Sequence, residues 1–451
     1  MQVMKWSALA LAVTAGTTQL AFASAQDESK GFIEDSKLSV LNKNYAFYRD
    51  FRNNTSDRQS YRNEWAHGIM ATYESGYTQG TVGFGIDAHG MLGLKLNSGG
   101  GTNGTGLLPI STDPDDEKAQ DSYSYAGGAV KVRVSNTELK YGNLIPVAPV
   151  FATGTARLFP GSAEGFQILS KEIDGLSVDA GHFTSIRDGS ASTNRDGEIS
   201  TAYTASRTVT ADSADYVGGT YVINDNVSVS LYGSELEDIW RQYYGNVNLS
   251  LPLSDDQALG FDFNIYRTND EGSSKAGDIS NTAFSLAASY SVGAHKFTLA
   301  HQRVHGDEPF DYIAMDLQNS GDSIFLANSV QYSDFNGPGE KSWQARYDLN
   351  MATLGVPGLS FMARYITGKD VDGTHADPNG AYATIAGKDG KEWERDLEVK
   401  YVVQEGPAKD LSFRVRHATW RSNNDMGGFY SAGSSAVDEV RVITEYPLDI
   451  L

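Results

Sequence analysis

The chain has 451 residues with 36 Lys and Arg against 57 Asp and Glu, so its formal net charge is −21 at pH 7. A chain this acidic is not expected to bind nucleic acid. It has no cysteine, which excludes a small secreted module held by disulfides; its many Gly, Tyr and Phe residues fit a large sheet closed on itself.

The first 25 residues are organised like a secretory signal peptide. Residues 1–5 form a short basic start, residues 6–22 are apolar, and Ala21-Phe22-Ala23 or Ala23-Ser24-Ala25 supplies the small-x-small cleavage pattern. This segment is too short and too rich in Ala and Thr for a membrane-spanning helix, and an N-terminal amphipathic helix is the alternative. We therefore predict a signal peptide at 1–25 and one exported domain at 26–451, beginning near Ser24 or Gln26.

The first predicted strand, 39–49, alternates poorly, because Tyr45 and Phe47 share parity with Lys43 and Arg49. Its two faces therefore cannot be assigned from the pattern. Residues 65–77 and 81–96 follow as two strands. The Gly-rich segment 99–106 and the acidic segment 113–117 predict a long solvated loop, since their spacing does not match that of an EF-hand.

Residues 126–140 predict one half of a hairpin. The next segment, 141–161, is apolar without alternating and contains Pro146, Pro149 and Pro160. Because proline is excluded from central strands, we expect this segment to fold into a barrel and narrow its lumen, with Arg157 at the narrowing. An outer loop packed on its neighbours is the alternative.

Further strands are predicted at 167–183, 199–207, 214–223 and 227–232, with a tight turn at Asn224-Asp225-Asn226, and at 261–265, 343–349 and 359–365. Short connections alternate with long ones along the rest of the chain. Such alternation is typical of an outer-membrane barrel, and roughly 425 mature residues allow about 16 to 20 spanning strands.

The C-terminal strands separate apolar from charged residues most clearly. In 397–403 and 411–416 one face is apolar, while the other includes Lys400, Arg414 and Arg416. In an outer-membrane barrel the apolar face meets lipid and the charged face lines the lumen. Arg441, Arg346 and Arg364 face inward by the same parity. Two interpretations stay open: arginines paired with neighbouring acids to stiffen the wall, or a row of cations that guides an anion.

Several segments resemble the OprD family of pseudomonad outer-membrane channels. They are 31–36 (GFIEDS), 75–85 (SGYTQGTVGFG), 170–176 (SKEIDGL), 235–244 (ELEDIWRQYY) and, most extensively, 259–350. The resemblance covers nearly the whole mature chain. It implies an all-β fold, a transmembrane antiparallel β-barrel of about 18 strands, often trimeric, with an inward-folded constriction loop that matches 155–160 here.

The resemblance also implies passive, substrate-specific passage of small carboxylate-bearing solutes, such as basic amino acids, small peptides and carbapenem antibiotics. On the basic side, the positions that match the family are Arg49, Arg58, Lys400, Arg414, Arg416 and Arg441, with Arg62 as an alternative to Arg58 and Ile443 where another cation sometimes stands. On the opposing acidic and aromatic side they are Tyr203, Tyr312, Asp322, Ser329, Tyr332 and Asp334. The same resemblance supports Arg157 in the constriction.

Other functions remain as alternatives: a channel for aromatic or small organic acids, a wider general porin, or a barrel hydrolase using His182, Ser185, Asp188 and Ser323. The chain has no Gly-x-Ser-x-Gly turn, which argues against the hydrolase. We expect no cofactor and no metal site. The expected partners, besides solutes, are outer-membrane lipid and lipopolysaccharide, the barrel-assembly machinery through the C-terminal strand, and two further copies of the chain.

Overall fold

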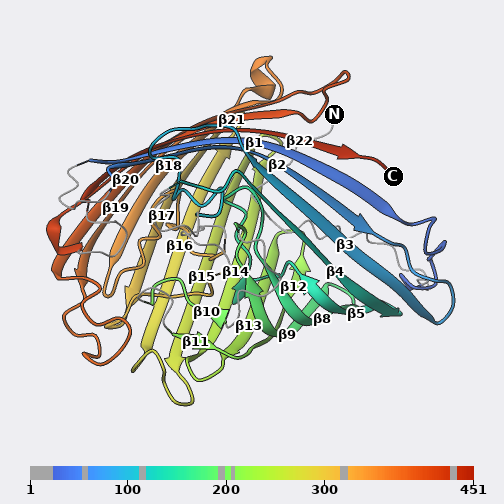
Figure 1. Cartoon of the computed structure of the whole chain (residues 1–451), viewed down its shortest axis with the longest axis horizontal. Helices are drawn as coiled ribbons and strands as arrows, with labels where there is room; N and C mark the ends of the chain where they lie inside the picture. The colour runs from blue at the N-terminus through green and yellow to red at the C-terminus, as the bar shows by residue number, and fades with distance from the viewer. Residues whose placement is uncertain are drawn as a thin grey trace.

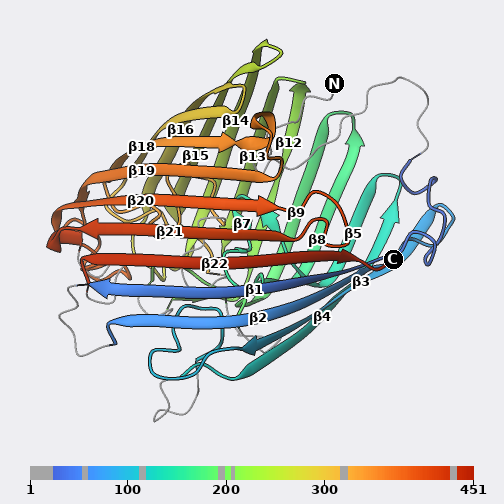
Figure 2. The same ribbon diagram turned by 90° about the horizontal axis from the view of Figure 1, so that it is seen from above.

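One sheet of eighteen strands dominates the described residues and closes into a barrel. This computed structural model describes residues 24–52, 59–110, 118–190, 199–204, 209–314, 323–426 and 434–451. Every strand of the sheet pairs antiparallel with its neighbours, and β1 (Lys37–Arg52) pairs with β22 (Ala436–Asp449) from Ser39↔Asp449 to Arg52↔Ala436. β1 and β22 lie side by side where the wall closes (Figures 1 and 2). The predicted all-β barrel is confirmed.

The other wall strands are β2 (Tyr61–Glu74), β3 (Val82–Lys95), β4 (Ser122–Val134), β5 (Thr137–Leu144), β8 (Ser162–Ile173), β9 (Leu176–Arg187), β12 (Ala214–Asn224), β13 (Val227–Leu236), β14 (Trp240–Ser254), β15 (Gln257–Asp270), β16 (Ser280–Val292), β17 (His295–His305), β18 (Lys341–Asn350), β19 (Leu359–Asp372), β20 (Lys388–Val402) and β21 (Ser412–Ser422). Two short hairpins lie in the connections: β6 (Val147–Ala148) with β7 (Phe151–Ala152), and β10 (Ile199–Ser200) with β11 (Thr210–Ala211). The 3-10 turns are η2 (Met351–Leu354) and η3 (Asn424–Met426).

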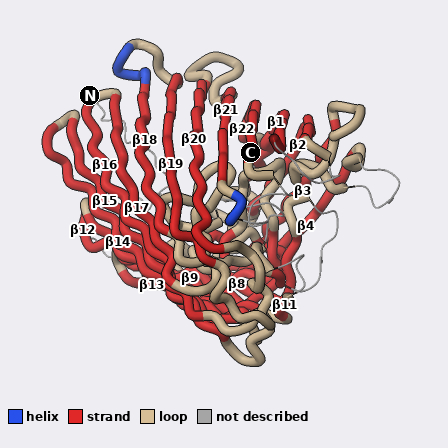
Figure 3. Tube along the Cα trace, turned by 90° about the vertical axis from the view of Figure 1, so that its left-hand side faces the viewer, coloured by secondary structure: helices blue, strands red, loops and turns tan. Residues whose placement is uncertain are grey.

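Short and long connections lie at opposite ends of the barrel. β12 and β13 are joined through Asp225 and Asn226 alone, whereas β17 and β18 are separated by residues 306–340. In Figure 3 η2 lies in one of the short connections, between β18 and β19. No helix of the described residues is long and apolar enough to cross a membrane.

The strict alternation of the C-terminal strands separates two environments. Leu397, Val415 and Val442 are exposed on the outer face, whereas Asp396 and Arg441 are buried on the inner face. Exposed apolar side chains on three adjacent strands form a continuous band that suits a lipid surface.

β1 alternates in burial but not in polarity, because its inward side chains include aromatic rings as well as cations. Tyr45, Phe47 and Arg49 are all buried, and the hydroxyl of Tyr45 donates to the carbonyl oxygen of Ala156 in the segment that crosses the lumen (3.2 Å). Aromatic rings therefore line this sector of the lumen beside the cations. This explains why the hydropathy pattern did not assign the faces.

Four predicted elements differ from the structure. The inward segment was predicted to begin at residue 141, but residues 141–144 end the wall strand β5. The run 126–140 spans two strands, β4 and β5, with a tight turn between them, and 167–183 likewise spans β8 and β9 around the turn at Asp174 and Gly175. The run 199–207 was predicted as a wall strand; among its described residues, 199–204, only the first two are strand, and they pair with β11 inside a long connection. A short run with β-branched residues suits a wall strand as well as a strand in a connecting loop, so the sequence pattern alone did not distinguish the two.

The glycine-rich loop after β3 is more enclosed than predicted. Thr102, Thr105, Leu107 and Leu108 are buried, and the amide of Leu107 donates to Glu64 of β2 (3.1 Å). The acidic segment 113–117 lies outside the described residues.

The chain from Ser24 onward packs against the short-turn end. Gln26 is buried, and its side-chain amide donates to the carbonyl oxygens of Thr78 (2.9 Å) and Gly80 (3.0 Å). The predicted signal peptide lies almost wholly outside the described residues and stays a prediction.

Candidate functional site

The segment 145–161 crosses the lumen from wall to wall and forms the predicted constriction loop. At one end Phe151 stacks on Phe183 of β9, with ring centroids 4.7 Å apart, and Tyr266 of β15 donates to the carbonyl oxygen of Pro149 (3.0 Å). At the other end Lys43 of β1 donates to the carbonyl oxygen of Arg157 (2.7 Å). Since β1 and β15 lie on different sides of the barrel, the loop narrows the passage.

Arg157 lies in this loop as predicted, but it is held firmly in place. Its side chain is buried, and Nε donates to the carbonyl oxygen of Thr105 (2.8 Å). Gly68 of β2 leaves room for the same loop, because a Cβ there would lie only 2.9 Å from Leu158. Arg157 is therefore part of the constriction wall.

A second segment, from the long β17–β18 connection, also folds inward. The amides of Tyr332 and Ser333 donate to the two carboxylate oxygens of Glu394 on β20 (2.9 and 2.8 Å), and the hydroxyl of Ser333 donates to Glu392 (2.8 Å). These acids occupy inward positions of the strand that also contains Lys400. The acids therefore anchor a loop to the wall at the long-loop end.

The predicted cations come together on neighbouring strands. Lys400 lies directly opposite Arg414, and Arg416 lies opposite Arg441. Arg441 lies opposite Phe47, and Arg49 opposite Glu439. We call the set Arg49, Arg441, Arg416, Arg414 and Lys400 the lumen row; it runs from the long-loop end of the barrel toward the short-turn end.

Two acids hold the lumen row. Glu439 is fully buried between Arg49, with Nη2 to Oε2 at 2.8 Å, and Arg441, with Nε to Oε1 at 2.5 Å. Glu398 lies 3.4 Å from Nε of Arg414 and 3.1 Å from Nε of Arg416, without the alignment of a hydrogen bond. Lys400 makes no ion pair within the described residues.

Exposure is low at the long-loop end of the row and higher toward the short-turn end. The side chains of Arg441 and Arg49 are 1% and 8% exposed, whereas those of Arg416 and Arg414 are 19% and 34% exposed. The two interpretations of the lumen arginines therefore apply to different positions. Arg441 is paired and buried in the wall, while the side chains of Arg414 and Arg416 are partly exposed in the lumen.

Phe47 organises the buried end of the row, although the sequence did not single it out. The guanidinium carbons of Arg441, Arg49 and Arg157 lie 4.5, 5.1 and 5.4 Å from the centre of its ring. An aromatic face attracts cations at such distances, so the ring helps gather three like charges. The sequence signal that could have identified Phe47 is that it shares one face of β1 with Lys43 and Arg49.

The opposing acidic and aromatic side is also assembled. Asp334 accepts hydrogen bonds from the hydroxyls of Tyr203 (2.5 Å) and Tyr312 (2.8 Å) at one oxygen and from Ser329 (2.5 Å) at the other. Tyr332 instead has its ring 4.9 Å from the guanidinium of Arg49, next to the lumen row. The second inward segment thus contributes Tyr332 to the basic side of the lumen and Ser329 and Asp334 to the acidic side.

Asp322 and Arg58 lie outside the described residues. Arg62, the alternative to Arg58, lies directly opposite Arg49 on β2 and donates to the carbonyl oxygen of Gly104 (2.8 Å). Arg364 and Arg346 face the lumen and pair with Asp396 (2.6 Å) and Asp348 (2.7 Å).

Asp311 supports the acidic side from behind and was not predicted. One oxygen accepts the amides of Ala202, Tyr203 and Tyr312 (3.0, 3.1 and 2.7 Å), and the other accepts the hydroxyl of Tyr382 (2.9 Å). Burial raises the pKa of Asp311 to about 6. Asp311 therefore positions both tyrosines that contact Asp334.

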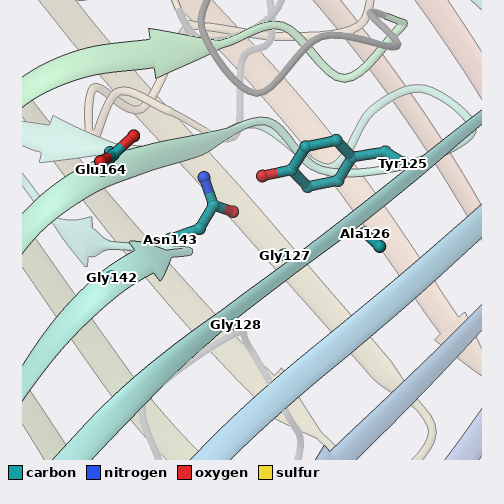
Figure 4. Close-up of a pocket in the computed structure, with 7 residues that line it drawn as sticks. All are labelled: Tyr125, Ala126, Gly127, Gly128, Gly142, Asn143 and Glu164. Atoms are coloured by element: carbon teal, nitrogen blue, oxygen red, sulfur yellow. The ribbon is translucent and has the colours of Figure 1, made fainter.

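A polar recess lies at the root of the constriction loop. Tyr125, Asn143 and Glu164 point into a cavity of about 370 Å³, which is otherwise lined by Ala126 and three glycines (Figure 4). A Cβ at Gly127 would lie 2.5 Å from Nε2 of His89, so the glycine lets the neighbouring strands bring these polar groups close.

Two side chains of the hydrolase alternative, His182 and Asp188, have other partners. His182 pairs with Asp215 (2.8 Å) on the outer face, while Asp188 accepts from the hydroxyl of Ser190 (3.0 Å). Among the described residues, no cluster of three or more His, Asp or Glu side chains is arranged to hold a metal ion.

A closed barrel with an apolar outer face and two loops crossing a charged lumen defines a porin-type channel. Residues 30–450 match the family model for outer membrane porins of the OprD family. The chain is 59% identical to porin D of Pseudomonas aeruginosa over the full length of both. It therefore belongs to the OprD family of outer-membrane porins.

Solved structures agree. A crystal structure of Pseudomonas aeruginosa OprD superposes with a TM-score of 0.81 at 56% identity, covering 96% of this chain and all of that one. Pseudomonas aeruginosa OpdK, solved with vanillate, superposes with a TM-score of 0.79 at 34% identity, covering 93% of this chain and all of the other. The chain is thus an outer-membrane protein, and its relatives are channels rather than enzymes.

Proposed function

We propose that the channel passes small carboxylate-bearing solutes by facilitated diffusion, with basic amino acids and small peptides as preferred substrates and carbapenems as further passengers. The observation that supports this most directly is the lumen row: like charges on adjacent strands, leading from the constriction to the short-turn end. A guanidinium suits this role because its planar fork binds a carboxylate through two parallel hydrogen bonds.

In this mechanism an anionic group is drawn toward the constriction by the field of the row and is then passed to Arg416 and Arg414. Glu398 places its negative charge 3.4 and 3.1 Å from Nε of the two side chains, and in this mechanism their terminal nitrogens bind the solute. Each contact has to be weak enough for the solute to leave, and the partial compensation by Glu398 weakens it in this sense.

The preference for basic amino acids rests on the opposing side. Asp334 is buried beneath the two tyrosines that donate to it, and its negative charge makes this side of the passage favourable for an ammonium or guanidinium group. A zwitterion with a cationic side chain would then have a partner for each end. A narrow passage crossed by two loops argues against the wider general porin.

A channel for aromatic acids is the second candidate, because aromatic rings lie among the cations of the lumen row: Phe47 and Tyr332 are both buried against Arg49. Vanillate bound to OpdK is an example of such a solute in a relative. An uptake panel of arginine, lysine, benzoate and glutamate in a channel-deleted host separates the two candidates: faster uptake of benzoate than of arginine would reject the first.

Charge reversal of the exposed part of the row tests the proposal itself. In a liposome-swelling assay Arg414→Glu with Arg416→Glu should slow arginine and benzoate by about tenfold or more, because a contact to an ionised group contributes roughly 1.5–3 kcal/mol. Arg241→Glu is the matched control, since Arg241 pairs with Glu235 on the outer face (2.8 Å). Equal rates in the double variant and the control would reject the row as a solute track.

We also propose that the channel assembles as a homotrimer and is inserted by the barrel-assembly machinery through its last strand, β22. Cross-linking in the native membrane would reveal the trimer, and insertion of a chain lacking residues 446–451 would reveal the dependence on the terminal strand.

A further inference from the structure

Four cations form a second row, on the outer face of the barrel. Arg303 of β17 lies directly opposite Lys341 of β18, Lys341 opposite Lys369 of β19, and Lys369 opposite Lys391 of β20. We call these four residues the outer row. At a strand spacing of about 4.8 Å it extends over roughly 14 Å of the wall.

The lumen-facing neighbours show that the outer row points away from the channel. Gln302, Ser342 and Glu392 precede or follow row members by one position and are buried against the second inward segment. Because successive side chains of a strand alternate, the row itself faces outward. It lies at the long-loop end, which in outer-membrane barrels is the external end.

The charge of this row is poorly compensated within the described residues. Asp370 pairs with Lys341 (3.0 Å) and interacts over longer distances with Lys369 and Lys391, so one acid serves three lysines; Arg303, Lys369 and Lys391 make no side-chain ion pair there, and Nε of Arg303 is buried without a hydrogen bond. Like charges placed directly opposite destabilise a sheet, so the row has unused affinity for an anion.

Several other outer-face cations near the same end are paired with acids, while Arg267 and Arg395 donate to Asn269 (2.6 Å) and Thr419 (3.1 Å). Arg421 and Arg52 both contact Asp438 (2.9 and 2.5 Å), and Arg241 contacts Glu235 and Glu271 (2.8 and 3.2 Å). The outer row differs from these positions because its four cations lie directly opposite one another, in a chain whose net charge is −21.

A band of aromatic side chains lies immediately below the row, toward the membrane. His301 and Trp343 stack with ring centroids 4.4 Å apart, and Tyr365 stacks on Trp393 at 5.7 Å. Trp and Tyr favour the boundary between hydrocarbon and headgroups. Side chains one step further out, such as Lys341 and Lys391, then lie at headgroup level.

From this placement we infer that the outer row is a binding site for the phosphate groups of an outer-leaflet lipid. Phosphate oxygens accept from several ammonium and guanidinium donors at once, which would relieve the repulsion along the row. The acyl chains of the same lipid would lie against the aromatic band and the apolar residues below it, including Leu299 and Leu397. One lipid molecule would thus contact the outer row through its phosphates and the aromatic band through its acyl chains.

The test measures lipid binding by the full-length protein in detergent. Fluorescent bis-phosphorylated lipid A is titrated against the wild type, with the dephosphorylated lipid of identical acyl chains as comparator. Lys369→Gln with Lys391→Gln should weaken binding of the phosphorylated lipid by about 25-fold, since each cation near an anionic surface contributes about fivefold. Arg241→Gln is the matched control and should bind as the wild type does.

A charge-preserving variant, Lys369→Arg with Lys391→Arg, should retain binding, which separates loss of charge from loss of folding. Equal affinity of the wild type for the phosphorylated and dephosphorylated lipids would overturn the inference. So would unchanged binding in the glutamine double variant. Complete competition by millimolar inorganic phosphate would identify a general anion site and reject a lipid site.

Discussion

Glu439 is the acid on which the buried end of the lumen row depends most. Its carboxylate is 0% exposed and contacts the guanidiniums of Arg49 and Arg441, which are 8% and 1% exposed. It also accepts from the side-chain amide of Gln331 (2.9 Å). Glu439→Gln keeps the shape but leaves two buried guanidiniums without their counter-charge. Removing one partner of a buried ion pair costs about 3–5 kcal/mol, and we expect a loss of this size in the free energy of unfolding.

The loss can be measured by guanidinium chloride unfolding of the barrel in liposomes. Glu445→Gln is the matched control on the same strand, since Glu445 is 34% exposed and lies 3.3 Å from Lys43. For such a partly exposed pair we expect about 1 kcal/mol or less. If the two variants lose equal stability, or Glu439→Gln loses less than about 1 kcal/mol, the reasoning about the buried row fails.

Two further predictions concern residues that the sequence did not single out. Burial raises the pKa of Asp311 to about 6 in the folded protein, so folding favours the protonated carboxyl group. The free energy of unfolding of the wild type should therefore fall by up to about 3 kcal/mol as the pH rises from 4 to 7, and that of Asp311→Asn should not. A pH-independent difference between the two proteins in unfolding experiments would contradict this. Phe47→Leu should lower the free energy of unfolding by about 1–3 kcal/mol more than the loss of buried apolar area alone would, because the ring of Phe47 faces three guanidinium groups. Phe166→Leu, on the exposed outer face, is the control, and equal unfolding free energies in the two variants would show that the ring acts only by its size.

Sequence pattern predicted the C-terminal wall well because lipid and lumen impose opposite demands on successive side chains. Leu397 and Val415 could be assigned outward, and Arg414 and Arg416 inward, without any coordinates. The same rule failed on β1, because the inward side there packs against a loop rather than water. Tyr45 and Phe47 face inward because they contact the constriction loop and the cations of the lumen row, and an alternation of polar and apolar residues does not reveal such contacts.

The constriction loop was predictable for a different reason. Three prolines in an apolar stretch exclude a wall strand, so the segment had to lie elsewhere. What it contacts was not predictable: Thr105, which accepts from Arg157, belongs to a connection 52 residues away. Asp311 is a stronger case, since its partners Ala202 and Tyr382 are 109 and 71 residues distant and no local pattern marks it.

The acids of the lumen explain how a strongly negative chain can present a cationic passage. Glu439 neutralises Arg441 where the wall is closed, while Glu398 only partly compensates Arg414 and Arg416 where the side chains reach the lumen. On β20 the acids Glu392 and Glu394 are instead turned to loop amides and hydroxyls, which removes their oxygens from the passage. Net charge therefore says little about the field that a solute meets. The strand position at which each acid lies decides whether it holds a loop, buries an arginine or leaves one available.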